Sequence, residues 1–179
     1  MYRSVIVLII VSLGSMLYAS NKPNTLQSVS CVELERYMGH WYQIAYFPSR
    51  FQPSGCKVVT SEYALNDEGI INVTNTCWDD YEKSVKRRQL TGKATVVSDS
   101  NAKFKIRFSR WLPFRADYWI INLDKEEYQY AVVSEPRRKY LWILSRVGTM
   151  REDLFKELVD DLKERGFDID NLKITAEIN

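Results

Sequence analysis

The sequence predicts an all-β protein: an eight-stranded antiparallel up-and-down β-barrel with one C-terminal α-helix packed on its outside. Short stretches in which apolar and polar residues alternate follow one another, and most are joined by hairpin turns. The last three stretches are apolar at nearly every position, so both of their faces must be covered. An amphipathic helix follows them and can supply that cover. Eight antiparallel strands close into a barrel that is just wide enough to hold one small ligand.

Eight stretches carry the strand pattern. The stretch Lys103–Phe108 alternates strictly, with apolar side chains on one face and cations on the other, which is typical of a strand between an interior and water. The polar run Asn66–Gly69 predicts a turn, and the charged run 78–86 predicts a loop. The predicted strands are Trp41–Phe47, Lys57–Leu65, Ile70–Cys77, Gln89–Val97, Lys103–Phe108, Tyr118–Leu123, Tyr128–Ser134 and Tyr140–Ser145.

One helix is predicted after the last strand, over Thr149–Arg165. Thr149, followed three residues later by Glu152, predicts a capping box at its start, and Gly166 stands where a helix ends. The helix is predicted to cover the outside of the last strands with one apolar stripe. That stripe consists of Leu154, Phe155, Leu158, Val159 and Leu162.

The first residues form a separate unit. Residues 1–19 have the pattern of a secretory signal peptide, with Arg3 before an apolar run and the small Ala19 at its end. The alternative, a membrane anchor, would need about 20 apolar residues. A lipoprotein anchor would need a cysteine directly after the apolar run, and Cys31 lies well beyond it. Residues 20–30 are predicted to be flexible, and residues 31–179 to form the barrel with its helix.

Bulk composition limits the possible functions. The chain has 179 residues and a net charge of +2, too small a charge to favour a nucleic-acid partner. Its single histidine, His40, has no recognisable catalytic partners, and the chain has no phosphate-binding or dinucleotide-binding glycine motif. One histidine and three scattered cysteines are too few for a metal site. We therefore expect no enzyme activity, no metal and no cofactor.

Two cysteines, Cys56 and Cys77, flank the second predicted hairpin. Pairing Leu65 with Ile70 places residue 77 opposite residue 58, so a small bulge would bring the two thiols within disulfide reach. Export would permit such a bond. Reduced thiols, or a bond from Cys31 to one of the pair, are the alternatives.

The two ends of the barrel sequence are predicted to meet. Gly39 and Trp41 stand at the start of the first strand, and Arg146 follows the last. A guanidinium stacked over an indole contributes roughly 0.5–2 kcal/mol. We expect this pair to close one end of the barrel, which places the ligand toward the opposite end.

The inward faces of the strands are the predicted functional surface. The small residues Ser61, Gly92 and Ala94 leave volume unfilled, against the alternative of a completely filled core. A large apolar void would be costly unless it were occupied. The candidate ligand-contacting residues of the cavity and its rim are Val59, Ser61, Tyr63, Val73, Phe104, Ile106, Phe108, Trp111, Phe114, Tyr118 and Trp142.

The loop Trp111–Arg115 is rich in aromatic residues and is predicted to lie at the open rim. Its aromatic side chains could contact a membrane surface, a second copy of the chain, or the ligand tail, or could pack against one another. Basic residues next to this loop, and in the runs 83–88 and 137–139, form a collar that an anionic head group would favour.

Three segments resemble the lipocalin family, and more narrowly its bacterial lipocalin and apolipoprotein D branch. They are residues 37–45 with the Gly-x-Trp motif, residues 108–121, and residues 140–146, and the resemblance spans about residues 34–167. Asp124 matches the centre of the family's Thr-Asp-Tyr motif, whereas Leu123 and Lys125 replace its neighbours. The resemblance implies fatty acids and lysophospholipids as ligands.

The resulting expectation is a protein that stores or transports amphipathic lipids in cell-envelope maintenance. It would lie in the periplasm, in association with the outer membrane, or outside the cell if the organism is not a Gram-negative bacterium. Two other functions remain open: a barrel that serves as a scaffold for protein–protein interaction, and a carrier of an isoprenoid or a pigment.

Overall fold

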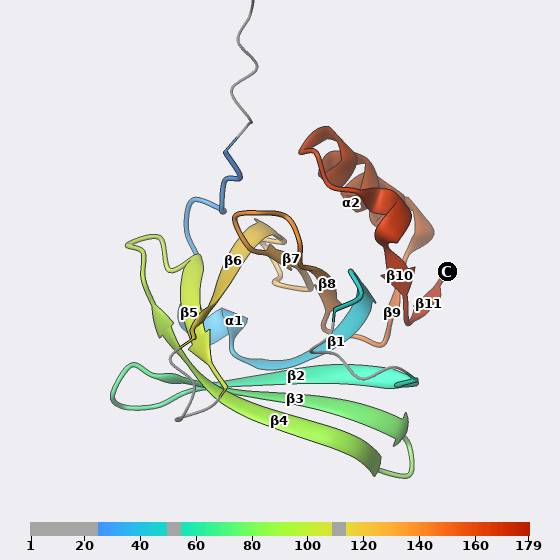
Figure 1. Ribbon diagram of the computed structural model, residues 1–179, viewed down its shortest axis with the longest axis horizontal. Helices are drawn as coiled ribbons and strands as arrows, with labels where there is room; N and C mark the ends of the chain where they lie inside the picture. Colours follow the sequence, from blue (N-terminus) through green and yellow to red (C-terminus); the bar gives the residue numbers. More distant parts are fainter. Residues whose placement is uncertain (1–24, 50–54, 109–113) are drawn as a thin grey trace, which may run out of the picture.

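The computed structural model describes residues 25–49, 55–108 and 114–179. Eight antiparallel strands form a ring, which closes because β1 pairs with β8 as well as with β2 (Figure 1). This confirms the predicted fold class. The strands are β1 (Gly39–Tyr46), β2 (Val58–Leu65), β3 (Ile71–Asp80), β4 (Val85–Val96), β5 (Lys103–Arg107), β6 (Ala116–Leu123), β7 (Tyr130–Ser134) and β8 (Leu141–Ser145).

Shorter elements complete the fold at both ends of the chain. A single helical turn, α1 (Leu34–Tyr37), precedes β1, and α2 (Glu152–Glu164) follows β8. The C-terminal segment adds a 3₁₀ turn, η1 (Ile169–Asn171), and β10 (Lys173–Ile174), which pairs with β1. Two further two-residue strands, β9 (Thr149–Met150) and β11 (Glu177–Ile178), pair in parallel. The sequence patterns did not predict the two-residue strands, because two residues carry no periodicity.

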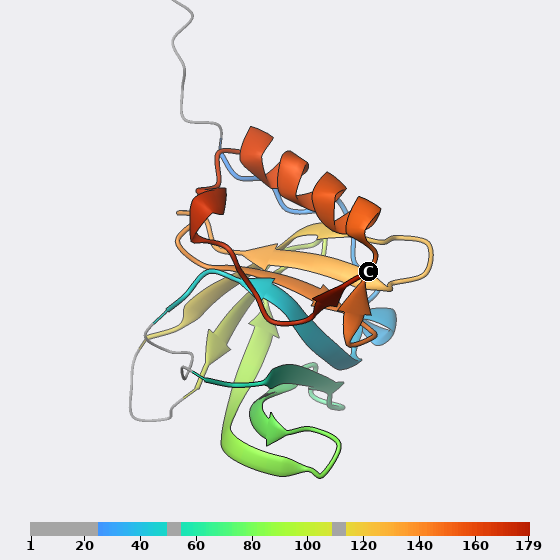
Figure 2. The ribbon, with the colours of Figure 1, turned by 90° about the vertical axis from the view of Figure 1, so that its right-hand side faces the viewer.

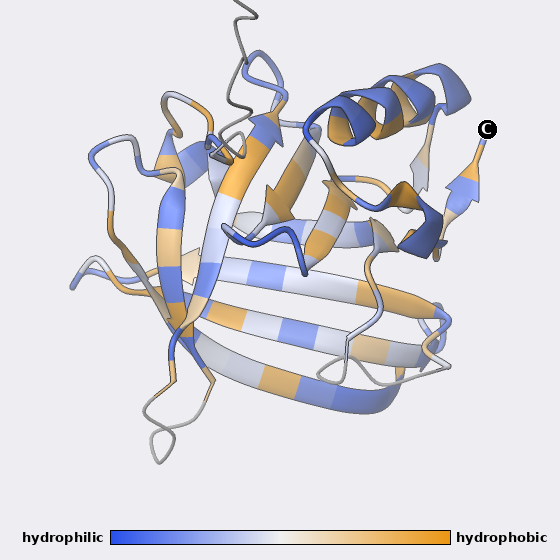
Figure 3. Ribbon diagram, turned by 45° about the horizontal axis from the view of Figure 1, so that its top comes forward, coloured by the Kyte–Doolittle hydropathy of each residue, from blue (hydrophilic) through white to orange (hydrophobic). Residues whose placement is uncertain are grey.

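Strand alternation produces two apolar cores. One fills the barrel interior and includes Trp41 and Ile120, and the other lies outside the ring and includes Ile121 and Ile143. The helix α2 lies over this outer core and contributes Leu158 (Figure 2). Figure 3 shows the apolar residues of α2 on the side that faces the sheet. The last strands are therefore covered on both faces, as predicted.

The β2–β3 hairpin differs from its predicted register by one residue. Leu65 pairs with Ile71, so Cys77 lies opposite Val59 and not opposite residue 58. The cause is the turn, in which the Asn66 carboxamide oxygen accepts hydrogen bonds from the backbone N–H groups of Glu68 and Ile70. Ile70 therefore belongs to the turn.

The charged run 78–86, predicted to be a loop, extends two strands. β3 continues to Asp80 and β4 begins at Val85. Polar cross-strand contacts on the outer face hold this extension, since the Trp78 indole donates to Thr60 at 2.9 Å and Arg87 pairs with Asp79. Such cross-strand pairs stabilise a strand even where apolar and polar residues do not alternate. The prediction used that alternation as its signal and therefore missed the extension.

The helix α2 begins at Glu152, three residues later than predicted. The expected capping box is absent, because Thr149 pairs with β11 and no side chain caps the first turn. The C-terminal end agrees with the prediction: Gly166 has a φ of 81°, the left-handed conformation that favours glycine after a helix.

The described part of the segment predicted to be flexible packs against the barrel. Leu26 is buried in the outer core, and the Val29 N–H donates to the Ile120 carbonyl at 2.9 Å. The docking has two causes: Leu26 buries an apolar side chain, and β6 extends past the end of its pairing with β5 at Trp119, which leaves the Ile120 carbonyl available. The proposed signal peptide, residues 1–19, lies outside the described residues. Among the helices of the three described ranges, none has the length and apolarity needed to span a membrane.

Candidate functional site

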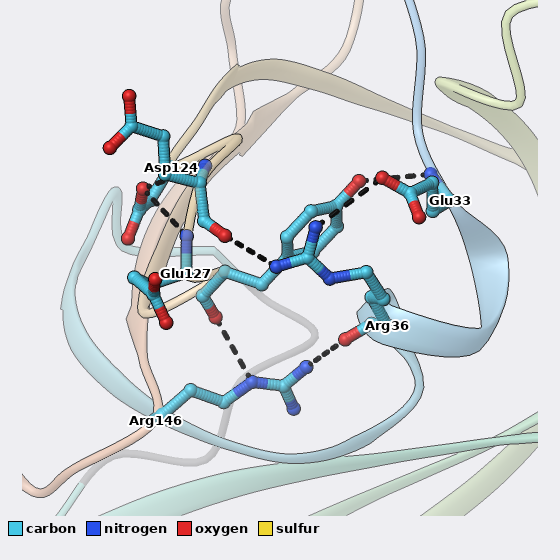
Figure 4. A network of polar contacts seen from close by, with 7 residues as sticks. Glu33, Arg36, Asp124, Glu127 and Arg146 are labelled. Carbon is cyan, nitrogen blue, oxygen red and sulfur yellow. Dashed lines mark hydrogen bonds and ion pairs between the residues drawn. The ribbon is translucent and has the colours of Figure 1, made fainter.

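One end of the barrel is sealed by Arg146. Its guanidinium lies 3.7 Å from the centroid of the Trp41 ring, as the sequence predicted. It also donates hydrogen bonds to four backbone carbonyl groups. Figure 4 shows the one to Arg36. Gly39 has a φ of 91°, and a Cβ there would lie 3.6 Å from the guanidinium, so glycine suits this position. The carbonyl groups belong to Arg36, Tyr37, His40 and Tyr128.

A second arginine, which sequence reasoning did not single out, reinforces this end. Arg36 lies over the Tyr128 ring at 4.3 Å and donates to the Glu126 carbonyl (Figure 4). Asp124 shapes the same β6–β7 loop, because its carboxylate accepts three backbone N–H groups of residues 126, 127 and 129. Asp124 and Arg146 therefore contribute to the structure of this end.

Three tyrosines form the floor of the interior above this seal. The Tyr37 and Tyr118 hydroxyls are 2.6 Å apart, and Tyr118 donates to Tyr63 at 2.9 Å. Phe104 stacks on Tyr118 with ring centroids 5.4 Å apart. Burial raises the pKa of each of the three hydroxyls above the usual tyrosine value. The floor is therefore an uncharged, hydrogen-bonded aromatic layer.

Exposure increases along the interior from this floor toward the opposite end. Among the predicted cavity residues, Tyr63, Val73, Phe104, Ile106 and Tyr118 are buried in the interior core. The others lie nearer the open end and are only half-buried: Val59, Ser61, Phe108 and Trp142. Phe114, at 78% exposure, stands free at the rim, and Trp111 lies outside the described residues.

The prediction that Gly92 leaves empty volume is wrong. The Phe108 ring lies 2.7 Å from the position that a Cβ on Gly92 would take, so the ring fills the space. Ala94 is fully buried as well. Ser61 and Gly92 are both partly exposed. The space that Gly92 leaves is taken by Phe108, and Ser61 is therefore the one of the three whose space no described contact is shown to fill.

The basic collar is partly engaged in contacts within the protein. Arg138 donates to the Arg165 carbonyl at the end of α2, and Lys83 pairs with Asp80 at 3.1 Å. Exposed cations remain at this end, on β4 and on the β5–β6 and β7–β8 loops. They are Arg88, Arg115, Arg137 and Lys139.

A hollow of about 450 Å³ lies outside the ring between β1, the β3–β4 hairpin and the C-terminal segment. Its polar groups meet one another: the Tyr42 and Tyr81 hydroxyls are 2.9 Å apart, and the Thr175 hydroxyl donates to the Gln43 carbonyl. That Tyr81 contact raises the pKa of Tyr42 to about 12. No cluster that could hold a metal ion occurs in residues 25–49, 55–108 and 114–179.

The disulfide predicted for the second hairpin is present. Cys56 and Cys77 are bonded, with their Cα atoms 5.4 Å apart, whereas Cys31 is a free, exposed thiol. The bond joins the strand ends at the open half of the barrel. It therefore holds the wall there, where the β2–β3 ladder ends.

Replacing Cys56 and Cys77 together with alanine is expected to lower the free energy of unfolding by about 3 kcal/mol. The bond spans a sequence separation of 21, and its loss frees that loop in the unfolded chain. Urea denaturation measures the effect, with Cys31→Ser as the control expected to match the parent protein. Equal stability of the double variant and the parent would contradict the prediction.

A closed antiparallel barrel with one sealed end and a half-exposed apolar interior defines a class: a carrier of one small hydrophobic ligand. Within this class the chain belongs to the lipocalin family, since residues 32–177 match the model of the lipocalin-like domain. Family members bind hydrophobic ligands and act in binding or transport, so the protein is not an enzyme.

Known proteins similar to this chain come from plants, bacteria and insects. Temperature-induced lipocalin-1 of Arabidopsis thaliana is 40% identical, over 85% of this chain and 83% of that protein. The outer membrane lipoprotein Blc of Vibrio cholerae is 35% identical, over 84% and 85%. The structure of insecticyanin from the tobacco hornworm Manduca sexta has a TM-score of 0.60 at 23% identity, over 83% and 82%.

Proposed function

We propose that this protein stores or transports an amphipathic lipid, a fatty acid or a lysophospholipid, with the acyl chain inside the barrel. The gradient of exposure along the interior carries this proposal. Half-buried apolar side chains beside a sealed floor favour an apolar occupant, because each buried methylene contributes about 0.8 kcal/mol. The exposed cations at the open end, Arg88, Arg115 and Arg137, would favour an anionic head group there.

The proposed location is the cell envelope, after export. The signal-peptide pattern of residues 1–19 supports this, as does the disulfide, which is typical of exported proteins. Relatives in Vibrio cholerae and Escherichia coli carry the name outer membrane lipoprotein. Peripheral contact with a membrane is part of the proposal, because Phe114 is 78% exposed beside the exposed Arg115.

Displacement of a fluorescent fatty acid tests the function. The purified protein is expected to bind the probe at micromolar concentration and to release it to competing acyl lipids. Val59→Lys, which adds a charge to the open half of the interior, should weaken binding at least about tenfold. Ala64→Lys on the exposed face of the same strand is the matched control. If no acyl lipid binds at tens of micromolar, the proposal is refuted.

A further inference from the structure

The barrel interior contains a buried polar atom that no other described residue satisfies. Asn75 follows Val73 on β3 at the spacing that keeps both side chains on the interior face. Its Oδ1 atom is buried and has no hydrogen-bond partner among the described residues. Because leaving a buried acceptor unpaired is costly, this atom favours a hydrogen-bond donor brought by an occupant.

A spare donor lies beside this acceptor. The hydroxyls of Tyr37, Tyr118 and Tyr63 are linked in a row by two hydrogen bonds. Three hydroxyls have three protons, and the two bonds use two of them. Tyr118 donates to Tyr63, so Tyr37 must donate to Tyr118, and the unused proton lies on Tyr63, two residues from Ser61 on the same face of β2. Ser61 is the cross-strand partner of Asn75.

The adjacent donor and acceptor select the chemistry of their partner. An uncharged hydroxyl can accept a hydrogen bond from the spare protein hydroxyl and donate one to Asn75 Oδ1. A carboxylate only accepts, and an ether only accepts, so both leave Asn75 Oδ1 unpaired. Between the sealed end and the subsite, the interior core residues are apolar or aromatic, and they favour a neutral group over an ion.

We infer that the interior contains a subsite, formed by Ser61, Tyr63 and Asn75, for an uncharged hydroxyl carried by the buried part of the ligand. This inference rests on the proposed lipid-binding function and adds a ligand class to it. Ser61 is three residues into β2 from the open end, which places the subsite about 10 Å below the rim. A hydroxyl within a fatty acyl chain reaches that depth while its head group stays at the rim. A long-chain alcohol reaches it by entering with its hydroxyl first.

Two matched ligand pairs distinguish these sources. The first compares octadecanoic acid with and without a mid-chain hydroxyl, and the second compares octadecan-1-ol with its methyl ether. In displacement titrations, the hydroxyl member of at least one pair is expected to bind about tenfold more tightly. A preference in the first pair identifies hydroxylated acyl chains, and one in the second identifies alcohols.

Variants link the preference to the subsite. Asn75→Leu, which has a similar volume, should reduce the preference to less than about twofold without weakening the ether or the plain acid. Ser61→Ala provides a second variant if Asn75→Leu melts early, and Asn72→Leu on the exposed face of β3 is the control. A preference that survives both interior variants would overturn the inference.

The outcomes also separate this inference from the proposed function. If all four ligands bind with equal affinity, the lipid-binding function stands and the subsite is refuted. That result is expected if a buried water, rather than the ligand, donates the hydrogen bond to Asn75 Oδ1. If none of the four binds and no lysophospholipid binds either, both proposals fail.

Discussion

Replacing Arg146 with alanine is expected to lower the free energy of unfolding by about 4 kcal/mol and to change ligand affinity by less than about threefold. The variant leaves four backbone carbonyl groups without their donor and uncovers the Trp41 ring, whose centroid lies 3.7 Å from the guanidinium. These contacts tie α1, β1 and the β6–β7 loop to the end of β8. Ligand affinity should persist, because the half-buried interior residues lie toward the other end.

Urea denaturation and fluorescent fatty acid displacement, measured on the same samples, test this separation. Arg146→Lys should recover part of the stability, since an ammonium keeps the charge but cannot reach all four carbonyl groups. Arg151→Ala is the control, because Arg151 is exposed and pairs with the exposed Asp153. Unchanged stability together with lost binding would show that Arg146 belongs to the ligand site.

The sealed end could be predicted from the sequence because each of its residue types has a restricted use. A glycine two positions before a tryptophan marks a tight approach of the backbone, and an arginine after an apolar strand needs a partner. Gly39, Trp41 and Arg146 meet as these rules predicted. Arg36 was missed because its ring partner, Tyr128, stands in a loop and has a positive φ, which no periodic pattern indicates.

The open half was harder to predict, because its properties depend on strand pairing. Asn75 appeared in the sequence only as one polar residue on an apolar face. Its position beside Ser61 depends on the β2–β3 register, which a single hydrogen-bonded turn shifts by one residue. Likewise, Gly92 indicated free space, which Phe108, opposite it in the β4–β5 register, fills. Volume inside a barrel follows from these cross-strand contacts more than from residue size.

The two halves of the barrel differ in a way that suits a carrier. The closed half is held by buried aromatic rings and by backbone hydrogen bonds from one guanidinium, so ligand entry and release need not disturb it. The open half has a half-exposed wall that the Cys56–Cys77 bond secures at its end. A rigid floor and a covalently held wall keep the interior in shape for its occupant.

Raising the pH above about 10 is expected to unfold the protein through its three floor tyrosines. Burial raises the pKa of Tyr37, Tyr63 and Tyr118 in the folded state above the usual value of 10.0. Below that value both states keep the protons, and stability does not depend on these groups. Above it the unfolded chain releases protons that the folded chain retains, so the stability falls as the pH rises. The slope is about 1.4 kcal/mol per pH unit for each tyrosine, or about 4 for the three together.

Urea denaturation at several values between about pH 9 and pH 11 measures this slope. Tyrosinate absorbance should rise together with unfolding, because the floor tyrosines ionise only when they reach water. In Tyr118→Phe the slope should fall by about a third, since one of the three protons is removed. The partly exposed outer pair Tyr42 and Tyr81 is tested separately with Tyr42→Phe, which leaves the floor intact. A free energy of unfolding that stays constant up to about pH 11 would contradict a floor made of buried neutral hydroxyls.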